Sequence, residues 1–153
     1  MNLFPFESYE INSEKKSEDI LSAIAAKSEK WSLRNLFLSN NKPLTGDVKG
    51  SRFKVYRSIK YRNSFLPVAV VEVKSLGTGS NAKITLRMHA FVTVFITIWL
   101  SMTLLAGIAF LYKSNGAMTF APFGMFLFGY LLMQICFWIE VPKIKSLLDL
   151  CCI

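Results

Sequence analysis

The sequence has few of the side chains on which most catalytic and metal sites are built. Its 153 residues include one histidine, His89, and three cysteines. A serine or cysteine nucleophile needs a nearby base, most often histidine, and a structural zinc site needs paired cysteine or histidine ligands. No aspartate closely follows His89, and no nucleophile lies in a recognisable turn. We therefore predict no catalytic residue, no metal site, no cofactor and no enzymatic activity.

The low cysteine content also argues against a disulfide framework. Cys136 lies in a long apolar stretch and Cys151 and Cys152 lie near the carboxyl end, whereas the polar first part of the chain has no cysteine. Small secreted domains that depend on disulfides carry paired cysteines. Residues 1–20 also lack the basic start and apolar run of a signal peptide. We therefore expect the polar part to stay in the cytoplasm.

Charge is absent from two long stretches of the chain, residues 90–112 and 117–139. At about 1.5 Å per residue, a helix over either stretch is about 34 Å long, whereas the hydrocarbon core of a bilayer is about 30 Å thick. Only the sequence KSNG, residues 113–116, separates the two stretches. This spacing predicts an antiparallel hairpin of two transmembrane helices. A helical pair in the core of a soluble protein is the alternative.

Basic residues beside the two spans predict how the spans are oriented. Five lie near the outer ends of the hairpin and one lies in its loop: Lys74, Lys83, Arg87, Lys143 and Lys145, against Lys113. Lysine and arginine are enriched on the cytoplasmic side of membrane proteins. We therefore predict an integral membrane protein with both termini in the cytoplasm.

Residues 1–89 carry nearly all of the formal net charge of +8 and are predicted to form a small α+β domain. An amphipathic helix is expected over residues 13–30, capped by Asn12 or Ser13. Its apolar face is formed by Ile20, Leu21, Ile24 and Trp31. Alternation of apolar and polar residues, or a run of valines, predicts strands at 4–11, 44–49, 52–61, 68–74 and 82–89.

The expected fold is therefore a small antiparallel sheet of four or five strands with one amphipathic helix across it, followed by a two-helix transmembrane hairpin. The domain boundaries are 1–89 for the cytoplasmic domain, 90–141 for the hairpin and 142–153 for a short cytoplasmic tail. Pro142 is expected to end the second helix. The tail is expected either to lie on the membrane surface or to dock on the domain.

The last two strands set the position of the domain relative to the membrane. The glycine-rich turn at residues 75–81 is expected to place Val68 opposite His89, where the first span starts. The connection YRNSFLP, residues 61–67, then lies beside the bilayer. The residues predicted to contact the headgroup region are Tyr61, Arg62, Phe65, Leu66 and His89. The alternative is that Phe65 and Leu66 cap the core of the sheet.

A basic surface is expected on the outer face of the sheet. Its members are Lys54, Tyr56, Lys60, Lys83 and Arg87, with Thr85 and His89 beside them. Three interpretations stay open, namely a solvated surface, binding to anionic lipid headgroups and binding to an acidic protein partner. Nucleic acid is not an expected partner, because aromatic stacking positions are few and the membrane anchor restricts access.

Small, hydroxyl and amide side chains recur along both spans. They are Thr93, Thr97, Ser101 and Gly107 in the first span and Gly124, Gly129 and Gln134 in the second. Such residues allow close backbone approach and hydrogen bonding between membrane helices, so we predict that they form the seam of the hairpin. No ionisable residue lies within either span, which argues against a proton relay or an ion-coupled carrier. A pore formed by several copies is the alternative.

Three motifs resemble a family of small bacterial two-span membrane proteins that has no established activity. They are YRNSFLP (61–67), LRMHAFV (86–92) and PFGMFLFGYLL (122–132), the last within the helical hairpin. The resemblance covers residues 42–139 and implies the architecture of that family, in a bacterial inner membrane. No functional residue carries over from it.

These observations together predict a non-catalytic, membrane-anchored binding or regulatory module that acts as a subunit of a larger membrane complex. The expected partners are membrane lipids, anionic ones included, and a protein. The alternative function is an oligomeric channel or a transport accessory protein.

Overall fold

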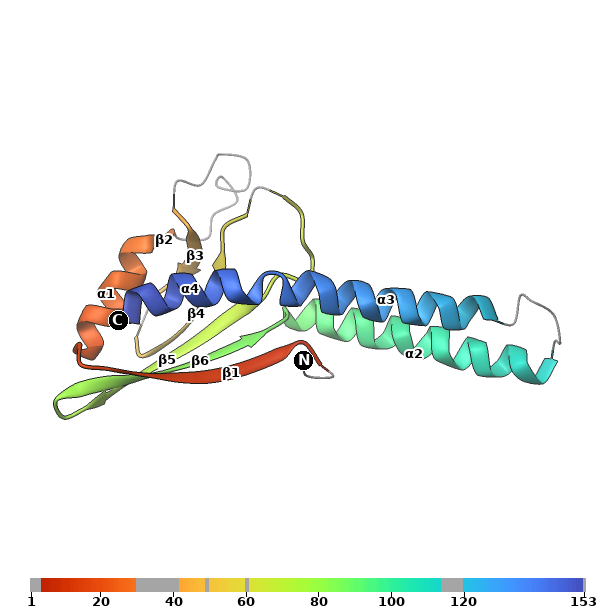
Figure 1. Cartoon of the computed structure of the whole chain (residues 1–153), viewed down its shortest axis with the longest axis horizontal. Coiled ribbons are helices and arrows are strands. Elements are labelled where there is room, and N and C mark those ends of the chain that lie inside the picture. Colours follow the sequence, from red (N-terminus) through yellow and green to blue (C-terminus); the bar gives the residue numbers. More distant parts are fainter. Residues whose placement is uncertain (1–3, 30–41, 49, 60, 114–119, 153) are drawn as a thin grey trace.

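Figure 1 shows the computed structural model of the chain. It describes residues 4–29, 42–48, 50–59, 61–113 and 120–152. Trp31 of the expected helix face, Lys60 of the expected basic surface and residues 114–116 of the expected hairpin loop lie outside the described residues. The described part has an α+β fold, in which a sheet and two helices form a domain and two long helices project from it (Figure 1).

The described residues form a six-stranded sheet with the strand order β1-β6-β5-β4-β3-β2. The strands are β1 (Phe6–Ser13), β2 (Ser28–Glu29), β3 (Leu44–Asp47), β4 (Arg52–Arg57), β5 (Val68–Leu76) and β6 (Gly79–Arg87). Neighbouring strands are antiparallel, except that β2 and β3 are parallel. Each predicted strand is present. Strand β2 was not predicted, because an alternating pattern cannot be recognised in two residues.

Four helices lie in the described residues, namely α1 (Ser17–Lys27), α2 (Ala90–Lys113), α3 (Ala121–Trp138) and α4 (Val141–Cys152). Helix α1 starts later than predicted, after Lys16, and no side chain caps it. Ser13 is the last residue of β1, and its Oγ donates a hydrogen bond to the carbonyl oxygen of Cys152 (2.5 Å). The predicted cap is therefore wrong, because Ser13 belongs to the sheet and joins β1 to α4.

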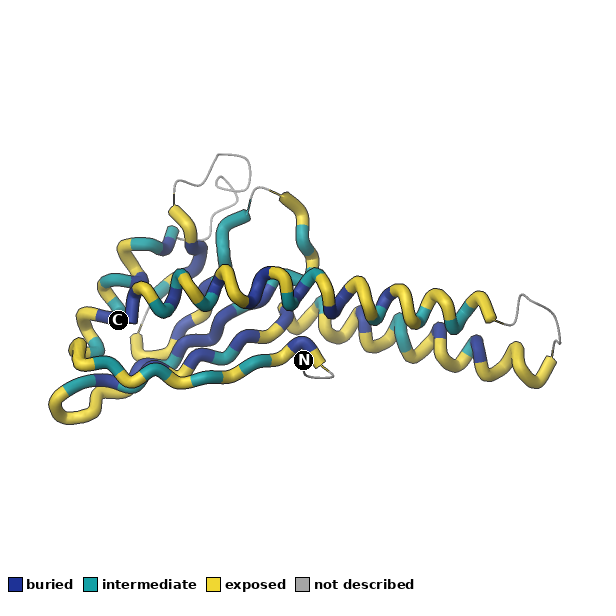
Figure 2. The backbone as a smooth tube through the Cα atoms, in the orientation of Figure 1, coloured by how far each residue is buried: buried dark blue, intermediate teal, exposed yellow. Residues whose placement is uncertain are grey.

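The core of the domain lies between the inner face of the sheet and helices α1 and α4 (Figure 2). Side chains from all three are fully buried, among them Val55, Val71, Ile84 and Leu86 of the sheet, Ile20 and Ile24 of α1, and Ile144 and Leu148 of α4. Burial of each such side chain contributes about 1.5–3 kcal/mol. The apolar face predicted for the first helix is confirmed at Ile20 and Ile24, but α1 shares the cover of the sheet with α4.

The second helix of the hairpin ends before Pro142, at Trp138, but the segment after it is also helical and has Pro142 in its first turn. Only Ile139 and Glu140 separate α3 from α4, and α4 runs on in line with α3 (Figure 1). Proline is tolerated in the first turn of a helix, because its missing N–H has no intrahelical partner there. Of the two places predicted for the tail, the structure shows docking on the domain.

The turn between β5 and β6 is tighter than predicted. Leu76 pairs with Gly79, which leaves a two-residue turn with Gly77 at a φ of +40°. Val68 therefore lies opposite Arg87 and not opposite His89. The predicted register is wrong by two residues. Because side chains alternate with a period of two, a shift of two leaves every residue on its predicted face.

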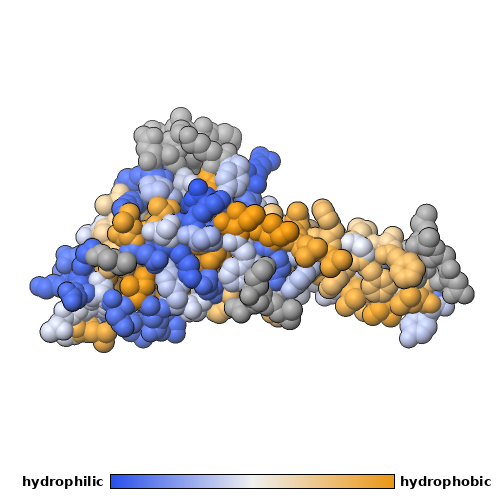
Figure 3. Space-filling model, in the orientation of Figure 1, coloured by the Kyte–Doolittle hydropathy of each residue, from blue (hydrophilic) through white to orange (hydrophobic). Residues whose placement is uncertain are grey.

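Helices α2 and α3 lie side by side and extend away from the domain (Figure 1). Of the described residues, they contain the two segments long and apolar enough to cross a membrane. In the most apolar part of α2 only 11% of the residues are buried. In the most apolar part of the helix that begins at Ala121, 22% are buried. On the face drawn in Figure 3, apolar side chains cover most of this hairpin. The alternative of a helical pair in a soluble core does not fit this exposure, because core helices are mostly buried.

Candidate functional site at the domain–hairpin junction

Strand β6 passes into helix α2 through two residues, Met88 and His89. His89 is exposed, and its Nδ1 accepts a hydrogen bond from the backbone N–H of Phe91 (3.3 Å). Its carbonyl oxygen accepts hydrogen bonds from the backbone N–H (3.0 Å) and the Oγ1 (3.2 Å) of Thr93. The first N–H groups of a helix lack intrahelical partners, so the His89 side chain caps α2 at the position predicted to face the headgroups.

Glu140 lies between α3 and α4 and is 1% exposed. Its Oε2 accepts a hydrogen bond from Arg57 Nη1 (2.6 Å) and its Oε1 accepts one from Lys143 Nζ (2.7 Å). The Tyr61 hydroxyl also donates to Oε1. The donors come from β4, from the connection after β4 and from α4. One buried carboxylate thus joins three segments at the point where the hairpin meets the domain.

The charges around Glu140 compensate one another. Burial acts to raise the pKa of the Glu140 carboxyl, whereas the hydrogen bonds from Lys143, Tyr61 and Arg57 act to lower it. The hydrogen bonds outweigh burial, so the pKa of Glu140 lies below its usual value of 4.5. The same hydrogen bond to Glu140 raises the pKa of Lys143. The cluster therefore keeps its ion pairs at neutral pH.

The YRNSFLP connection is fastened to the end of α3. Asn63 Nδ2 donates a hydrogen bond to the carbonyl oxygen of Cys136 (3.1 Å), and Asn63 Oδ1 accepts one from the backbone N–H of Phe65 (3.0 Å). Phe65 is half-buried and packs against the core, as expected if it caps the sheet, and Leu66 is also half-buried. Tyr61 and Arg62 are exposed. The structure thus places the connection beside the junction, as predicted from the order of the strands, but with Phe65 facing inward.

Helix α4 is held to edge strand β1 by polar contacts. Lys145 forms an ion pair with Glu7, and its Nζ lies 4.6 Å from the centroid of the Tyr9 ring. The Tyr9 hydroxyl donates a hydrogen bond to Asp149 Oδ1 (3.4 Å). Burial, followed by the Asp149 charge, raises the pKa of Tyr9 well above its usual value. The phenol therefore stays protonated and keeps this hydrogen bond at every physiological pH.

The outer face of the sheet is less basic than the sequence indicates. Lys54, Lys83 and Arg87 are exposed and Tyr56 is half-buried. Acidic side chains alternate with the basic ones, since Lys83 Nζ lies 3.6 Å from Glu10 Oε1 and Lys74 Nζ lies 3.5 Å from Glu72 Oε1. Arg52 lies opposite Glu72 in the register. Arg87, at the end of β6 next to the hairpin, forms no ion pair with any residue that the structure describes.

Only some of the residues predicted for the hairpin seam lie between the two helices. Gly107 faces the ring of Phe123 and Gly129 faces the ring of Trp99, each so closely that a Cβ atom would lie within 3 Å of the ring. Gln134 is buried and hydrogen-bonds Tyr130 and Trp138 of its own helix. The seam is thus built from glycines packed on aromatic rings.

The other predicted seam residues lie elsewhere. Thr93, Thr97 and Ser101 are exposed, and each hydroxyl donates to the carbonyl oxygen four residues earlier, at 3.2, 2.8 and 2.8 Å. Gly124 is exposed, and a Cβ atom there would meet open space. The expectation of a threonine and serine seam therefore differs from the structure, because these hydroxyls find partners within their own helix.

An apolar groove of about 890 Å³ runs from the domain onto the hairpin. Its domain end is formed by Phe4, Phe6 and Arg87, and its walls are formed by α2 and α3. Thr93, Thr97 and Ser101 line it on the α2 side. The hydroxyl stripe recognised in the sequence thus belongs to a groove and not to the helix seam.

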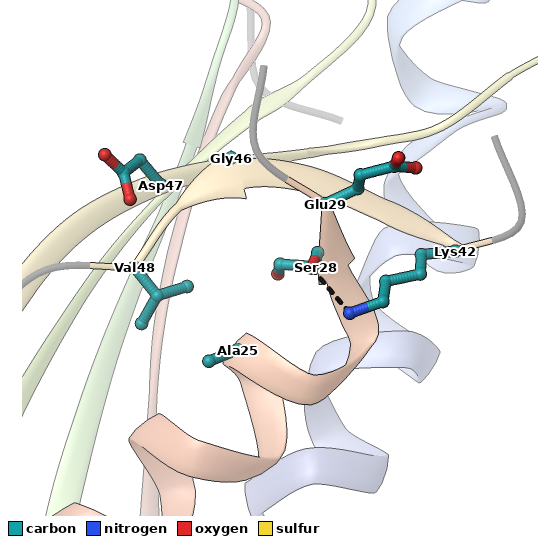
Figure 4. Close-up of a pocket in the computed structure, with 7 residues that line it drawn as sticks. All are labelled: Ala25, Ser28, Glu29, Lys42, Gly46, Asp47 and Val48. Atoms are coloured by element: carbon teal, nitrogen blue, oxygen red, sulfur yellow. Dashed lines mark hydrogen bonds between the residues drawn. The ribbon is translucent and has the colours of Figure 1, made fainter. Parts of the chain in front are cut away.

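A second, smaller recess lies at the other end of the sheet, beside β2 and β3 (Figure 4). It has a volume of about 500 Å³, and Lys42 Nζ donates a hydrogen bond there to the carbonyl oxygen of Ser28 (3.2 Å). Its wall includes Glu29 and Asp47. Among the described residues, no group of three or more histidine, cysteine, aspartate or glutamate side chains is placed to hold a metal ion.

Comparison with known proteins adds no relative, since no protein-family model, no curated protein and no solved structure matches the chain. The resemblance carried by the three motifs stays a prediction.

The Glu140 cluster and the groove are the features that sequence reasoning missed. Glu140 directly follows the second charge-free stretch, and a buried carboxylate is costly unless it is paired. The position of Glu140 could therefore have indicated a paired carboxylate. Its partners Arg57 and Tyr61, however, lie 83 and 79 residues away in the sequence, so no local pattern connects them to it.

Proposed function

We propose that this protein is a non-catalytic, membrane-anchored binding module, which acts as a regulatory part or subunit of a larger membrane complex. In this proposal α2 and α3 span a bacterial inner membrane, and the domain and both termini lie in the cytoplasm. The excess of basic residues at the domain end of the hairpin supports this orientation.

The observation that carries the proposal is the rigid attachment of the domain to both ends of the hairpin. Two residues join β6 to α2, and two residues join α3 to α4, whose apolar face is buried in the domain core. A flexible tether would let the domain search the space near the membrane. This attachment instead holds the sheet in one orientation, which suits a module that presents a fixed surface to a neighbour in the same membrane.

The surface offered to a protein partner is the outer face of the sheet. Helices α1 and α4 pack on the inner face, and the outer side chains Lys54, Lys83 and Glu10 are exposed. Alternating charges of this kind favour specificity for a complementary surface over simple attraction to acid. We therefore infer that the domain binds a protein partner through the outer face of its sheet.

The test is to purify the tagged full-length protein from its native membranes in mild detergent and identify what is retained by mass spectrometry. We expect a protein partner in a fixed ratio to the chain. Replacing Lys54 and Lys83 with glutamate should release that partner, whereas Lys16→Glu, at an exposed lysine before α1, should not. A chain that retains no protein, or that loses its partner equally in both variants, would contradict the docking role.

A second candidate function is an oligomeric channel or transport accessory. One observation favours it, namely that Thr93, Thr97 and Ser101 are exposed along one side of α2 and not used in the seam. Several copies that turned this stripe inward would enclose a hydroxyl-lined path. Detergent-resistant oligomers with a measurable conductance in planar bilayers would support this function, and a stable monomer would exclude it.

A further inference from the structure

The apolar groove has the length expected for one leaflet of a membrane. It begins at Phe6 and Arg87 in the domain and extends along α2 from Ala90 to Ser101. At 1.5 Å per residue this part of α2 is about 17 Å long. The hydrocarbon core of a bilayer is about 30 Å thick, so one leaflet contributes about 15 Å. The groove therefore spans the depth reached by a single acyl chain from the leaflet next to the domain.

Among the described residues that line the groove, only Arg87 is charged, and it lies at the domain end. Arg87 is exposed, and its neighbours across the sheet are Phe6 and Val68, which are apolar. On the two strands that flank β6, the acidic residues of this face are Glu10 and Glu72, which align with Lys83, four residues along β6. At about 3.3 Å per residue they lie about 13 Å farther from the membrane end. Among the residues that the structure describes, no acid of this face thus lies beside the Arg87 guanidinium, where a lipid phosphate would lie.

The inner surface of the groove suits a hydrocarbon chain. The hydroxyls of Thr93, Thr97 and Ser101 already donate to backbone oxygens of α2, so they present mainly their carbon atoms to a ligand. Phe4 (71% exposed) and Phe6 (47% exposed) stand at the mouth. Apolar walls below a single guanidinium match the shape of a phospholipid, with a hydrocarbon chain below an anionic phosphate.

We propose that the groove binds one anionic phospholipid of the adjoining leaflet, with an acyl chain along α2 and the phosphate on Arg87. The proposal rests on the membrane embedding described under the proposed function. It does not depend on the protein partner or on Lys54, through which binding of that partner is tested.

The first test uses the full-length protein in mild detergent with phosphatidylglycerol and phosphatidylcholine of equal chain length, and counts retained lipids by native mass spectrometry. We expect one retained phosphatidylglycerol per chain, favoured about fivefold over phosphatidylcholine. Arg87→Gln should remove this preference. Lys83→Gln is the matched control, because Lys83 lies on the same strand and face but pairs with Glu10 outside the groove. Equal losses in the two variants would overturn the proposal, since they indicate general surface attraction.

The second test fills the groove. Thr97→Trp places a large side chain in it, whereas Ile98→Trp changes an exposed neighbour on α2 that does not line it. We expect Thr97→Trp to abolish retention of both lipids and Ile98→Trp to retain them, with equal helical content in both by circular dichroism. Full retention in Thr97→Trp would overturn the proposal. So would a dimer that Thr97→Trp dissociates, because the occupant would then be a second copy. Neither lipid retention nor lipid preference requires a protein partner. If the chain retains no partner, the lipid proposal can therefore still hold, and the two proposals can fail independently.

Discussion

At the scale of single residues, Glu140 shows how a charge is kept at the edge of an apolar hairpin. An unpaired buried carboxylate would be costly, but Arg57, Tyr61 and Lys143 donate to this one. Neutralising this carboxylate leaves Arg57 and Lys143 without their counter-ion, and this loss exceeds the net value of the pairs.

Glu140→Gln is therefore expected to lower the free energy of unfolding by about 2 kcal/mol. Glu10→Gln is the control, because Glu10 pairs with Lys83 on the exposed outer face, where such pairs contribute less than about 1 kcal/mol. Unfolding of the full-length protein by denaturant in detergent measures both. Equal effects of the two substitutions would show that the Glu140 cluster is no stronger than a surface pair.

The lowered pKa of Glu140 also predicts a dependence of stability on pH. Folding lowers this pKa below 4.5, so the folded state favours the ionised form more than the unfolded state does. Its contribution is full above pH 4.5 and is lost as the pH falls through the folded-state value. The melting temperature of the protein should fall over this acid range more steeply than that of Glu140→Gln. Parallel curves would contradict the prediction.

Residues also differ within the hairpin seam. A Cβ atom at Gly129 would lie 2.2 Å from Cζ3 of Trp99, whereas one at Gly124 would meet open space. Gly129→Ala should therefore destabilise the hairpin by about 1–3 kcal/mol, and Gly124→Ala should be neutral or stabilise it by up to about 1 kcal/mol. Titration with a denaturing detergent, followed by circular dichroism, compares the two. A neutral Gly129→Ala would show that the Trp99 ring moves aside.

At the scale of elements, α4 supplies part of the core of a domain that precedes it by the whole hairpin. Leu148 is fully buried in the core of the domain, whereas Leu150, two residues farther along α4, is 68% exposed. Leu148→Ala should lower the free energy of unfolding by about 3 kcal/mol, and Leu150→Ala should change it by less than about 0.5 kcal/mol. Similar values for the two variants would mean that α4 does not stay docked in solution.

Elements with a clear period were predictable, and contacts between distant elements were not. Alternation located β4 and β6, a run of valines located β5, and the charge-free stretches located α2 and α3, because each signal lies within a few neighbouring residues. The register of β5 and β6 depended on the exact turn, where glycine permits more than one geometry. Docking of α4 had only its amphipathic pattern as a signal, and Pro142 was consistent both with the end of a helix and with its first turn.

The candidate site followed the same division. The position of His89 at the start of α2 was readable from the change of period after it. The exposed hydroxyl stripe was readable as a periodic feature but was assigned to the seam, because sequence spacing alone does not show which side of a helix meets its partner. The Glu140 cluster combines segments that only the fold brings together.

At the scale of the whole molecule, the domain is joined to the two-helix hairpin twice, so either connection alone should hold its orientation. We predict that four glycine and serine residues inserted after Met88 leave a narrow distance distribution between spin labels at Thr78 and Tyr112. Adding a second insertion of the same length after Ile139 should broaden the distance distribution. Electron paramagnetic resonance measures these distances in nanodiscs. Broadening by the first insertion alone would show that α4 does not act as a second attachment.

The return of α4 to the sheet also orders the events of synthesis. Strands β1 to β6 leave the ribosome before the hairpin, and α4 leaves it after the hairpin. Until then the inner face of the sheet lacks the apolar side chains of Ile144 and Leu148. The domain therefore completes its core only after both helices of the hairpin have been made. A nascent chain that stops before α4 would expose an unfinished core, the kind of surface that chaperones and proteases recognise.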